Sequence, residues 1–320
     1  PAVESCATGN VDESCDGEAK CTGAGVWSVK LGEATNTQAG EDVALDADGN
    51  VLVAGWFVTG IGFGSFAGGT DAFVAKLGPS GALVWGKTFG AAGNDKALSV
   101  ATDTSGNVFV AGTFETSIDF GDGKSLTATG MADVFVAKLG PDGTAMWAVK
   151  LASSGNDSLG SLAVTPSGDV AVAGRFAGSF SVNGTGLTTV AADQNIYVAK
   201  LSGANGTTSW AKSYGDSSSQ AAYGVAVDAS GNILVAGGMG GSVDFGLGPI
   251  NSAGGQDAFA LKLSSAGTTL WAKRYGDAGV DQSLLVVAAG PNGGFHAAGL
   301  VDGSIDFGGG ALAGSGVEPR

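Results

Sequence analysis

The sequence is poor in charged residues, histidine and cysteine, and each shortage narrows what the chain can do. Charged residues make up 14% of its 320 residues, which excludes a chain kept disordered by its own charge. His296 is the only histidine, so no serine-histidine-acid triad can be assembled convincingly. Residues 22–320 contain no cysteine, which excludes a cysteine nucleophile or a cysteine zinc site from most of the chain.

Basic residues and long hydrophobic runs are also scarce. Fifteen Lys and Arg face 30 Asp and Glu, and the net charge of −15 repels nucleic acid and anionic membranes. No apolar run approaches the roughly 18 to 20 residues that span a bilayer. We therefore expect no nucleic-acid partner and no membrane insertion; neutral or cationic ligands fit the charge better.

The three cysteines gather in one short acidic segment, residues 1–24, which reads as a linker or attachment segment. Cys6, Cys15 and Cys21 are the disulfide candidates, and their odd number leaves one thiol over. Clustered cysteines favour an oxidising, extracellular or cell-surface setting over the cytosol.

What the sequence does contain is a repeat. Five of its six tryptophans recur 58 to 63 residues apart: Trp27, Trp85, Trp147, Trp210 and Trp271. Each unit carries a hairpin signal such as "LSVATDTSGNVFVAGTF" (98–114), with counterparts at 43–57, 162–176, 225–239 and 286–300. A second hairpin, such as "DVFVAKLGPDGTAMWAVKLA" (133–152), has complete counterparts at 71–90, 195–215 and 257–276.

Four short strands per unit of about 60 residues, without helical periodicity, are typical of a β-propeller blade. The sequence therefore predicts an all-β, five-bladed β-propeller of four-stranded antiparallel blades over residues 25–320. The last blade would be shared between the two chain ends, combining the Trp strand at 25–32 with the hairpin at 283–300.

That shared blade lacks its third strand, which would leave two unpaired sheet edges. Three explanations stay open: the native chain continues beyond Arg320; residues 302–317 or the N-terminal segment fill the gap; or a neighbouring molecule donates a strand, giving self-association through the incomplete blade.

The pattern "AxDxxGNVxVAGxF…DFG…DxFVAKL…W" resembles the bacterial β-propeller repeat called the SBBP repeat, over about residues 26–310. That resemblance implies a propeller fold and a secreted or surface-exposed bacterial protein, and no single activity. Through "DESCDG", residues 1–24 resemble Cys/Asp-rich metal-binding stretches of bacterial surface proteins.

One set of polar residues aligns at the start of the first strand of each unit: Gln38, Asp95, Asp157, Gln220 and Asp281. A ring of such residues at one mouth of a central channel could bind a cation or another ligand. The structural alternative, which we favour, is that these side chains cap loop amides.

Two further sites are suggested by local patterns. "DADGN" (46–50) resembles the opening of a calcium loop through Asp46 and Asp48, although a glycine-containing hairpin turn explains all five copies better. Trp56 and Arg175 occupy a variable position at a strand end, where a ligand such as a sugar could be contacted.

Other recurrent residues read as structural. "IDFG" (118–121) returns at 243–246 and 305–308, and we interpret it as a loop whose apolar residues pack inward and whose Asp accepts local hydrogen bonds. His296 aligns with buried positions, so we expect a packed histidine. The lysines near the tryptophans, with Lys76, Lys138, Lys200 and Lys262, are assigned to exposed outer strands.

The sequence thus favours a non-catalytic, secreted or surface-displayed propeller that serves as a binding or structural module for a protein or glycan partner. The alternative is a lectin-like or calcium-dependent ligand binder, with calcium as its cofactor. A propeller hydrolase or lyase using Asp95 and Asp157 is a third candidate.

Overall fold

The structure is a computed structural model that describes residues 27–32, 37–64, 67–188 and 194–314. Two compact units divide the chain, Pro1–Leu31 and Gly32–Arg320. In the first unit the described residues, 27–31, contain no helix or strand. The segment 1–24 with Cys6, Cys15 and Cys21 lies outside the described residues.

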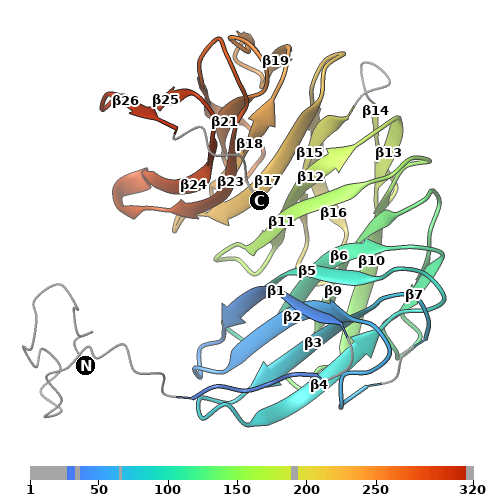
Figure 1. The fold of residues 1–320 in the computed structure, drawn as a ribbon. Helices are drawn as coiled ribbons and strands as arrows, with labels where there is room; N and C mark the ends of the chain where they lie inside the picture. Colours follow the sequence, from blue (N-terminus) through green and yellow to red (C-terminus); the bar gives the residue numbers. More distant parts are fainter. Residues whose placement is uncertain (1–26, 33–36, 65–66, 189–193, 315–320) are drawn as a thin grey trace, which may run out of the picture. The chain divides into compact units, whose positions relative to one another are not determined.

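The second unit consists of antiparallel sheets that follow one another along the chain (Figure 1). The first sheet contains β1 (Gln38–Leu45), β2 (Val51–Phe57), β3 (Asp71–Leu77) and β4 (Leu83–Phe89). The second contains β5 (Lys96–Thr102), β6 (Val108–Phe114), β9 (Asp133–Leu139) and β10 (Ala145–Ala152), and the hairpin of β13 (Ser179–Val182) and β14 (Thr185–Thr188) pairs with β10 and extends this sheet to six strands. The third contains β11 (Ser158–Val164), β12 (Val170–Phe176), β15 (Asn195–Leu201) and β16 (Thr208–Tyr214). The fourth contains β17 (Gln220–Val227), β18 (Ile233–Met239), β21 (Asp257–Leu263) and β22 (Thr269–Tyr275).

A fifth sheet has only two strands within the described residues, β23 (Gln282–Ala289) and β24 (Phe295–Val301), joined by the 3-10 turn η1 (Pro291–Gly293). The all-β class is confirmed, and so is the predicted order of four strands in the four complete sheets. The first strands β1, β5, β11, β17 and β23 each contact the next one in this series.

The expected fifth Trp strand at 25–32 is wrong for the residues that are described, because 27–31 form no strand. In the complete sheets the Trp strand pairs with a third strand, as β4 pairs with β3. No third strand accompanies β23 and β24 within the described residues.

The "DFG" segments form short hairpins between the second and third strands rather than loops. These hairpins are β7 (Ser117–Asp119) with β8 (Ser125–Thr127), β13 (Ser179–Val182) with β14 (Thr185–Thr188), β19 (Ser242–Asp244) with β20 (Pro249–Asn251), and β25 (Ser304–Asp306) with β26 (Ala311–Ala313). Ile118 and Phe120 are buried, and Asp119 Oδ1 accepts a hydrogen bond from the Gly121 amide at 2.9 Å. The predicted packing and local acceptor role are confirmed for this copy.

A β-bulge in every first strand explains the glycine of the recurrent "VAG" and "AAG" triplets. The strand register shifts at Gly40/Asp42, Ala97/Ser99, Leu159/Ser161, Ala222/Gly224 and Leu284/Val286. A Cβ on Gly112 would lie 1.8 Å from the Lys96 carbonyl oxygen and 2.9 Å from the Phe135 ring. Only glycine therefore fits where the bulged strand and the aromatic residue of the third strand both approach the second strand.

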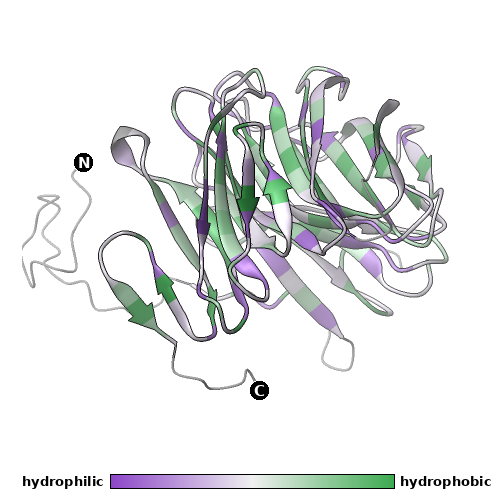
Figure 2. Cartoon of the chain, turned by 90° about the horizontal axis from the view of Figure 1, so that it is seen from above, coloured by the Kyte–Doolittle hydropathy of each residue, from purple (hydrophilic) through white to green (hydrophobic). Residues whose placement is uncertain are grey.

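The core lies between consecutive sheets. One hydrophobic cluster joins residues of the first and second sheets, and three further clusters join the second to the third, the third to the fourth and the fourth to the fifth. Hydrophobic residues alternate with polar ones along the strands of the sheets (Figure 2). The third strands β3, β9 and β21 are buried at all seven positions. For β9 this follows from its place in the second sheet, which packs on the first sheet on one face and on the third sheet on the other.

We predict that Gly112→Ala destabilises the protein by about 3 kcal/mol, because its Cβ overlaps the Lys96 carbonyl and the Phe135 ring. Gly186→Ala is the control, since a Cβ there meets nothing within 4 Å. Urea unfolding measures both variants. Equal stability of the two would show that the bulge does not demand glycine.

Candidate functional site

The bulges of the first strands converge on one cavity of about 230 Å³. The bulge residues all line it: Glu41, Leu98, Gly160, Tyr223 and Leu285. A bulge re-aims a side chain and bends its strand, so five bulges at equivalent positions place five strands around a common space. The lining comes from the first strands of all five sheets, which makes this cavity the candidate site.

Polar contacts hold the neighbouring first strands together beside this cavity. Asp42 Oδ2 accepts hydrogen bonds from Ser99 Oγ at 3.0 Å and from the Val100 amide at 2.8 Å. Ser99 Oγ accepts in turn from the Leu162 amide at 3.3 Å. These contacts join the first three sheets in series, so Asp42 and Ser99 have a structural role in the wall of the cavity.

Trp56 lies near this wall and contacts charged neighbours. Its Nε1 donates a hydrogen bond to Glu41 Oε1 at 2.6 Å, and Lys96 Nζ lies 4.9 Å from the centre of its ring. Trp56 and Arg175 are both half-buried, and each belongs to the second strand of its sheet. Because Glu41 also lines the cavity, its hydrogen bond connects Trp56 to the candidate site. The sequence did not indicate this connection.

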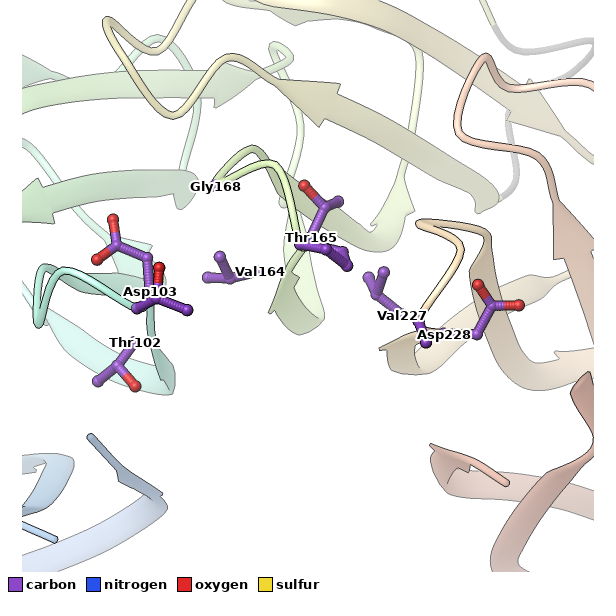
Figure 3. Close-up of a pocket in the computed structure, with 10 residues that line it drawn as sticks. Thr102, Asp103, Val164, Thr165, Gly168, Val227 and Asp228 are labelled. Atoms are coloured by element: carbon purple, nitrogen blue, oxygen red, sulfur yellow. The ribbon is translucent and has the colours of Figure 1, made fainter. Parts of the chain in front are cut away.

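A second cavity of about 260 Å³ lies between three hairpin turns, those that follow β5, β11 and β17 (Figure 3). Its lining includes Asp103, Thr165, Pro166 and Asp228. Asp103 and Asp228 use their carboxylates within their own turns, where they accept hydrogen bonds from the Asn107 and Asn232 amides at 3.0 and 2.9 Å. The two carboxylates that line this cavity, Asp103 and Asp228, are therefore already bound by groups of the protein, which also include Lys138 and Lys262.

In each of the four complete sheets an aspartate-lysine pair closes the hairpin turn, and the pairs of the first and fourth sheets are buried. In the first sheet, Lys76 Nζ lies 2.8 Å from Asp46 Oδ2, while Asp46 Oδ1 accepts from the amides of Asp48 and Asn50. The equivalent pairs are Lys138–Asp103, Lys200–Asp169 and Lys262–Asp228. The assignment of these lysines to exposed outer strands is wrong, because they lie in third strands and their charges are paired inside the sheets.

The Lys76 ammonium group takes the place that a cation would occupy beside Asp46. The pKa of Asp46 falls to about 2: burial alone raises it, but the hydrogen bonds from Lys76 and Asn50 outweigh burial. Asp48 is exposed and lies outside this pair. The hairpin-turn interpretation thus accounts for the geometry of Asp46, and calcium binding stays an untested prediction.

Four of the five residues of the predicted polar ring cap loop backbone, and three of them, Asp95, Asp157 and Gln220, are buried. Asp95 and Asp157 are 0% and 1% exposed and accept hydrogen bonds from the amides of Ala91 and Ser153 at 3.0 and 2.6 Å. Gln220 Nε2 donates to the Gly240 carbonyl at 3.0 Å, and Gln38 Nε2 donates to the Gly60 carbonyl at 3.4 Å. These contacts agree with the capping interpretation that the sequence favoured.

The fifth member of that set is Gln282, not Asp281. Gln282 pairs with Val301 as Gln38 pairs with Phe57, and it is fully buried whereas Asp281 is exposed. The loop from Gly276 to Gln282 is one residue longer than the loop from Gly215 to Gln220. That insertion shifts Asp281 out of the aligned position.

We call Gln38, Asp95, Asp157, Gln220 and Gln282 the cap residues. All except Gln38 lie close to the first residue of the third strand in the preceding sheet. A Cβ on Gly90 would lie 2.1 Å from Asp71 Oδ1 and 3.1 Å from Asp95 Oδ2, so the two carboxylates converge there. Burial first, and the nearby charge of Asp71 among smaller causes, raise the pKa of Asp95 to about 7. Asn195 and Gln220 replace both carboxylates at the equivalent junction, which shows that this place accepts neutral groups.

His296 is exposed, although a packed histidine was expected. It belongs to β24, whose counterparts β6, β12 and β18 are covered by third strands. Within the described residues β24 has no such cover, and its side chains remain at the surface for that reason.

Comparisons with known proteins do not identify the chain. No protein-family model matches this sequence, and no curated protein matches it either. A protein of unknown function from Bacteroides caccae is similar in structure over 76% of this chain and 83% of its own, with 10% identity and a TM-score of 0.37. The rhamnogalacturonan lyase PL11 of Bacillus licheniformis is similar over 89% of this chain and 60% of its own, with 13% identity and a TM-score of 0.32. Both TM-scores are too low to establish a shared fold.

We predict that Lys262→Met destabilises the protein by about 3 kcal/mol at pH 7, because it leaves the Asp228 carboxylate without its cation. The folded-state pKa of Asp228 is about 2, below its usual 3.8, so the stabilising pair is present above pH 4 and is lost as the pH falls toward 2. The difference between variant and parent should therefore shrink between pH 4 and pH 2. Urea unfolding at pH 7, 4 and 2.5 measures it.

The control is Lys273→Met, which removes an exposed lysine of β22 and should change stability by less than about 0.5 kcal/mol. A Lys262→Met loss that is the same at pH 7 and pH 2.5 would contradict the role of the pair.

We predict that Asp71→Asn stabilises the protein by about 1 kcal/mol at pH 8 and has no effect at pH 4. Asp95 has a folded-state pKa of about 7, raised above 3.8, so its ionisation costs stability as the pH rises from 4 to 7. The substitution removes the neighbouring charge and offers an amide donor. Unfolding at the two pH values measures the difference.

Asp133→Asn is the matched comparison, because Asp133 lies 3.7 Å from Lys150 and its removal also breaks that pair. We expect a smaller gain or none at pH 8. Equal gains at pH 4 and pH 8 for Asp71→Asn would refute the proposed cost of ionising Asp95.

Proposed function

We propose that this chain is a five-bladed β-propeller of the bacterial SBBP-like repeat type and acts as a non-catalytic binding module, secreted or displayed on the cell surface. The observation that carries the proposal is the cavity lined by the bulges of five successive first strands. Five repeats, stacked sheets and first strands around a common space are features of a propeller with a central channel. Function would then depend on what this channel binds.

The lining of the cavity favours a small neutral or cationic ligand. Glu41 and Asp42 contribute carboxylates, and no lysine or arginine belongs to the lining. The net charge of −15 also repels anions. Tyr223 in the lining, with Trp56 bound to Glu41, offers aromatic surface of the kind that stacks on sugar rings. A sugar unit of a glycan is therefore the ligand class to test first.

The carboxylates considered for hydrolysis or lyase chemistry are poorly placed to meet a substrate. Asp95 and Asp157 are buried under loops and accept backbone hydrogen bonds. General acid or base catalysis needs a group within hydrogen-bond reach of the substrate. This placement supports binding over catalysis as the proposed role.

We predict that Leu98→Arg weakens ligand binding at least tenfold, because the longer cationic side chain fills the cavity and opposes a cationic ligand. A glycan array and a panel of small amines, each probed with and without EDTA, measure binding. Leu83→Arg is the control, since Leu83 is an exposed residue of β4 that does not line the cavity.

Binding that survives Leu98→Arg would locate the ligand elsewhere, and no binding to either panel would count against the proposed function. Loss of binding on adding EDTA would favour the calcium-dependent alternative.

A further inference from the structure

The outer edge of β24 has the sequence and geometry of an interior strand, yet within the described residues no strand pairs with it. Its counterparts β2, β6, β12 and β18 each pair over seven residues with a third strand. All seven residues of β18 are buried, whereas β24 is exposed at five positions and half-buried at two. Leu300 in β24 is 56% exposed.

The fourth strand that forms an outer sheet edge carries a lysine in three sheets, and β24 carries none. The edge strands β4, β16 and β22 contain Lys87, Lys212 and Lys273. Charged residues on edge strands oppose unwanted pairing with other strands. β24 reads "FHAAGLV", without Lys, Arg, Asp or Glu, so its sequence is that of a strand meant to be paired on both sides.

Gly299 of β24 lacks the aromatic neighbour that its counterparts have. A Cβ on Gly55, Gly112, Gly174 or Gly237 would lie 2.6 to 2.9 Å from a ring atom of the third-strand aromatic, which is Phe73, Phe135, Tyr197 or Phe259. The nearest atoms to a Cβ on Gly299 belong to the backbone of β23, as they do in the other bulges, and no ring is among them. Gly299 therefore faces the backbone of the first strand as its counterparts do, but no aromatic ring of a third strand packs against it.

Gln38 identifies the residue that should begin the missing strand. At three other junctions the cap residue and the first residue of the third strand meet at a glycine, as Gln282 and Asp257 do at Gly276. A Cβ on Gly32 would lie 2.8 Å from Gln38 Oε1, so a glycine and a cap residue are close together here as well. The first residue of a third strand is the part of the arrangement that the described residues do not supply. An Asp or Asn at the start of an added strand would complete it.

We propose that β24 binds an extended peptide strand from another polypeptide by antiparallel strand addition, in the register that pairs β2 with β3. This register places Asp or Asn at Val301, Phe or Tyr at Gly299 and Leu at Phe295. The partner is thus a segment of the type Asp/Asn-x-Phe/Tyr-apolar-apolar-x-Leu, which this chain itself uses four times. Main-chain hydrogen bonds supply affinity in such complexes, and the side-chain pockets supply specificity.

The test uses the full chain and a synthetic peptide, DAFVAKLG, which copies residues 71–78. We expect one peptide to bind per chain in calorimetry, with slowed amide hydrogen exchange over residues 295–301. Replacing Phe by Ala in the peptide should weaken binding at least tenfold, because the contact with Gly299 is lost. A scrambled peptide of the same composition should not bind.

A double-mutant cycle tests the contact at Gln38 separately. Gln38→Ala and a peptide beginning with Ala should each weaken binding, and the two changes together should cost little more than one. A variant that fails to fold is recognised by its circular dichroism, and the peptide substitutions alone then decide.

Three outcomes would overturn the proposal. These are no binding of DAFVAKLG, equal binding of the scrambled peptide, and protection of residues 295–301 before peptide is added. In the last case, size-exclusion chromatography would show whether a second copy or the chain itself already covers the edge. Failure of this test leaves the cavity proposal intact, since the glycan and amine panels probe a different surface.

Discussion

The packing of each third strand against the second strand of the same sheet is the contact on which the rest of the fold depends. Its aromatic residue lies on a glycine, as Phe135 lies on Gly112, and the same glycine faces the bulged carbonyl of the first strand. One residue without a side chain thus lets three strands approach closely. The bulge lies beside this close approach, and the five bulge residues line the cavity that we propose as the binding site.

The two ends of each third strand connect it to groups outside its own sheet pairing. The lysine near its end neutralises the aspartate of the hairpin turn, as Lys262 does for Asp228. In β3, β15 and β21 the Asp or Asn at the start meets the cap residue of the next sheet at a glycine, as Asp257 meets Gln282. Buried charges are costly unless they are paired, so these contacts tie each strand to one position along the sheet. Where the third strand is missing from the described residues, β24 is exposed and His296 lies at the surface.

Most of the buried charged residues are ion-paired, but the Asp71–Asp95 junction is an exception. Two carboxylates converge there without a lysine, and the pKa of Asp95 is raised to about 7. The third junction uses Asn195 and Gln220 at the same place and avoids this cost. The repeat therefore tolerates different charge states at one position, because the capping hydrogen bonds to the loops are kept in each case.

Sequence alone was enough for the all-β class, the repeat, the hairpin turns and the strand order, because alternating apolar residues and turn glycines report local structure. It also indicated the capping role of Asp95 and Asp157. It did not indicate the bulges, the pairing of Lys76 with Asp46, the exchange of Asp281 for Gln282 or the exposure of His296. Each of these depends on residues far apart in the chain: the bulge residue Leu98 lines a cavity with Tyr223 and Leu285 only after the sheets have stacked. Tertiary structure decided them, since burial and charge pairing are properties of neighbours in space and not of neighbours in sequence.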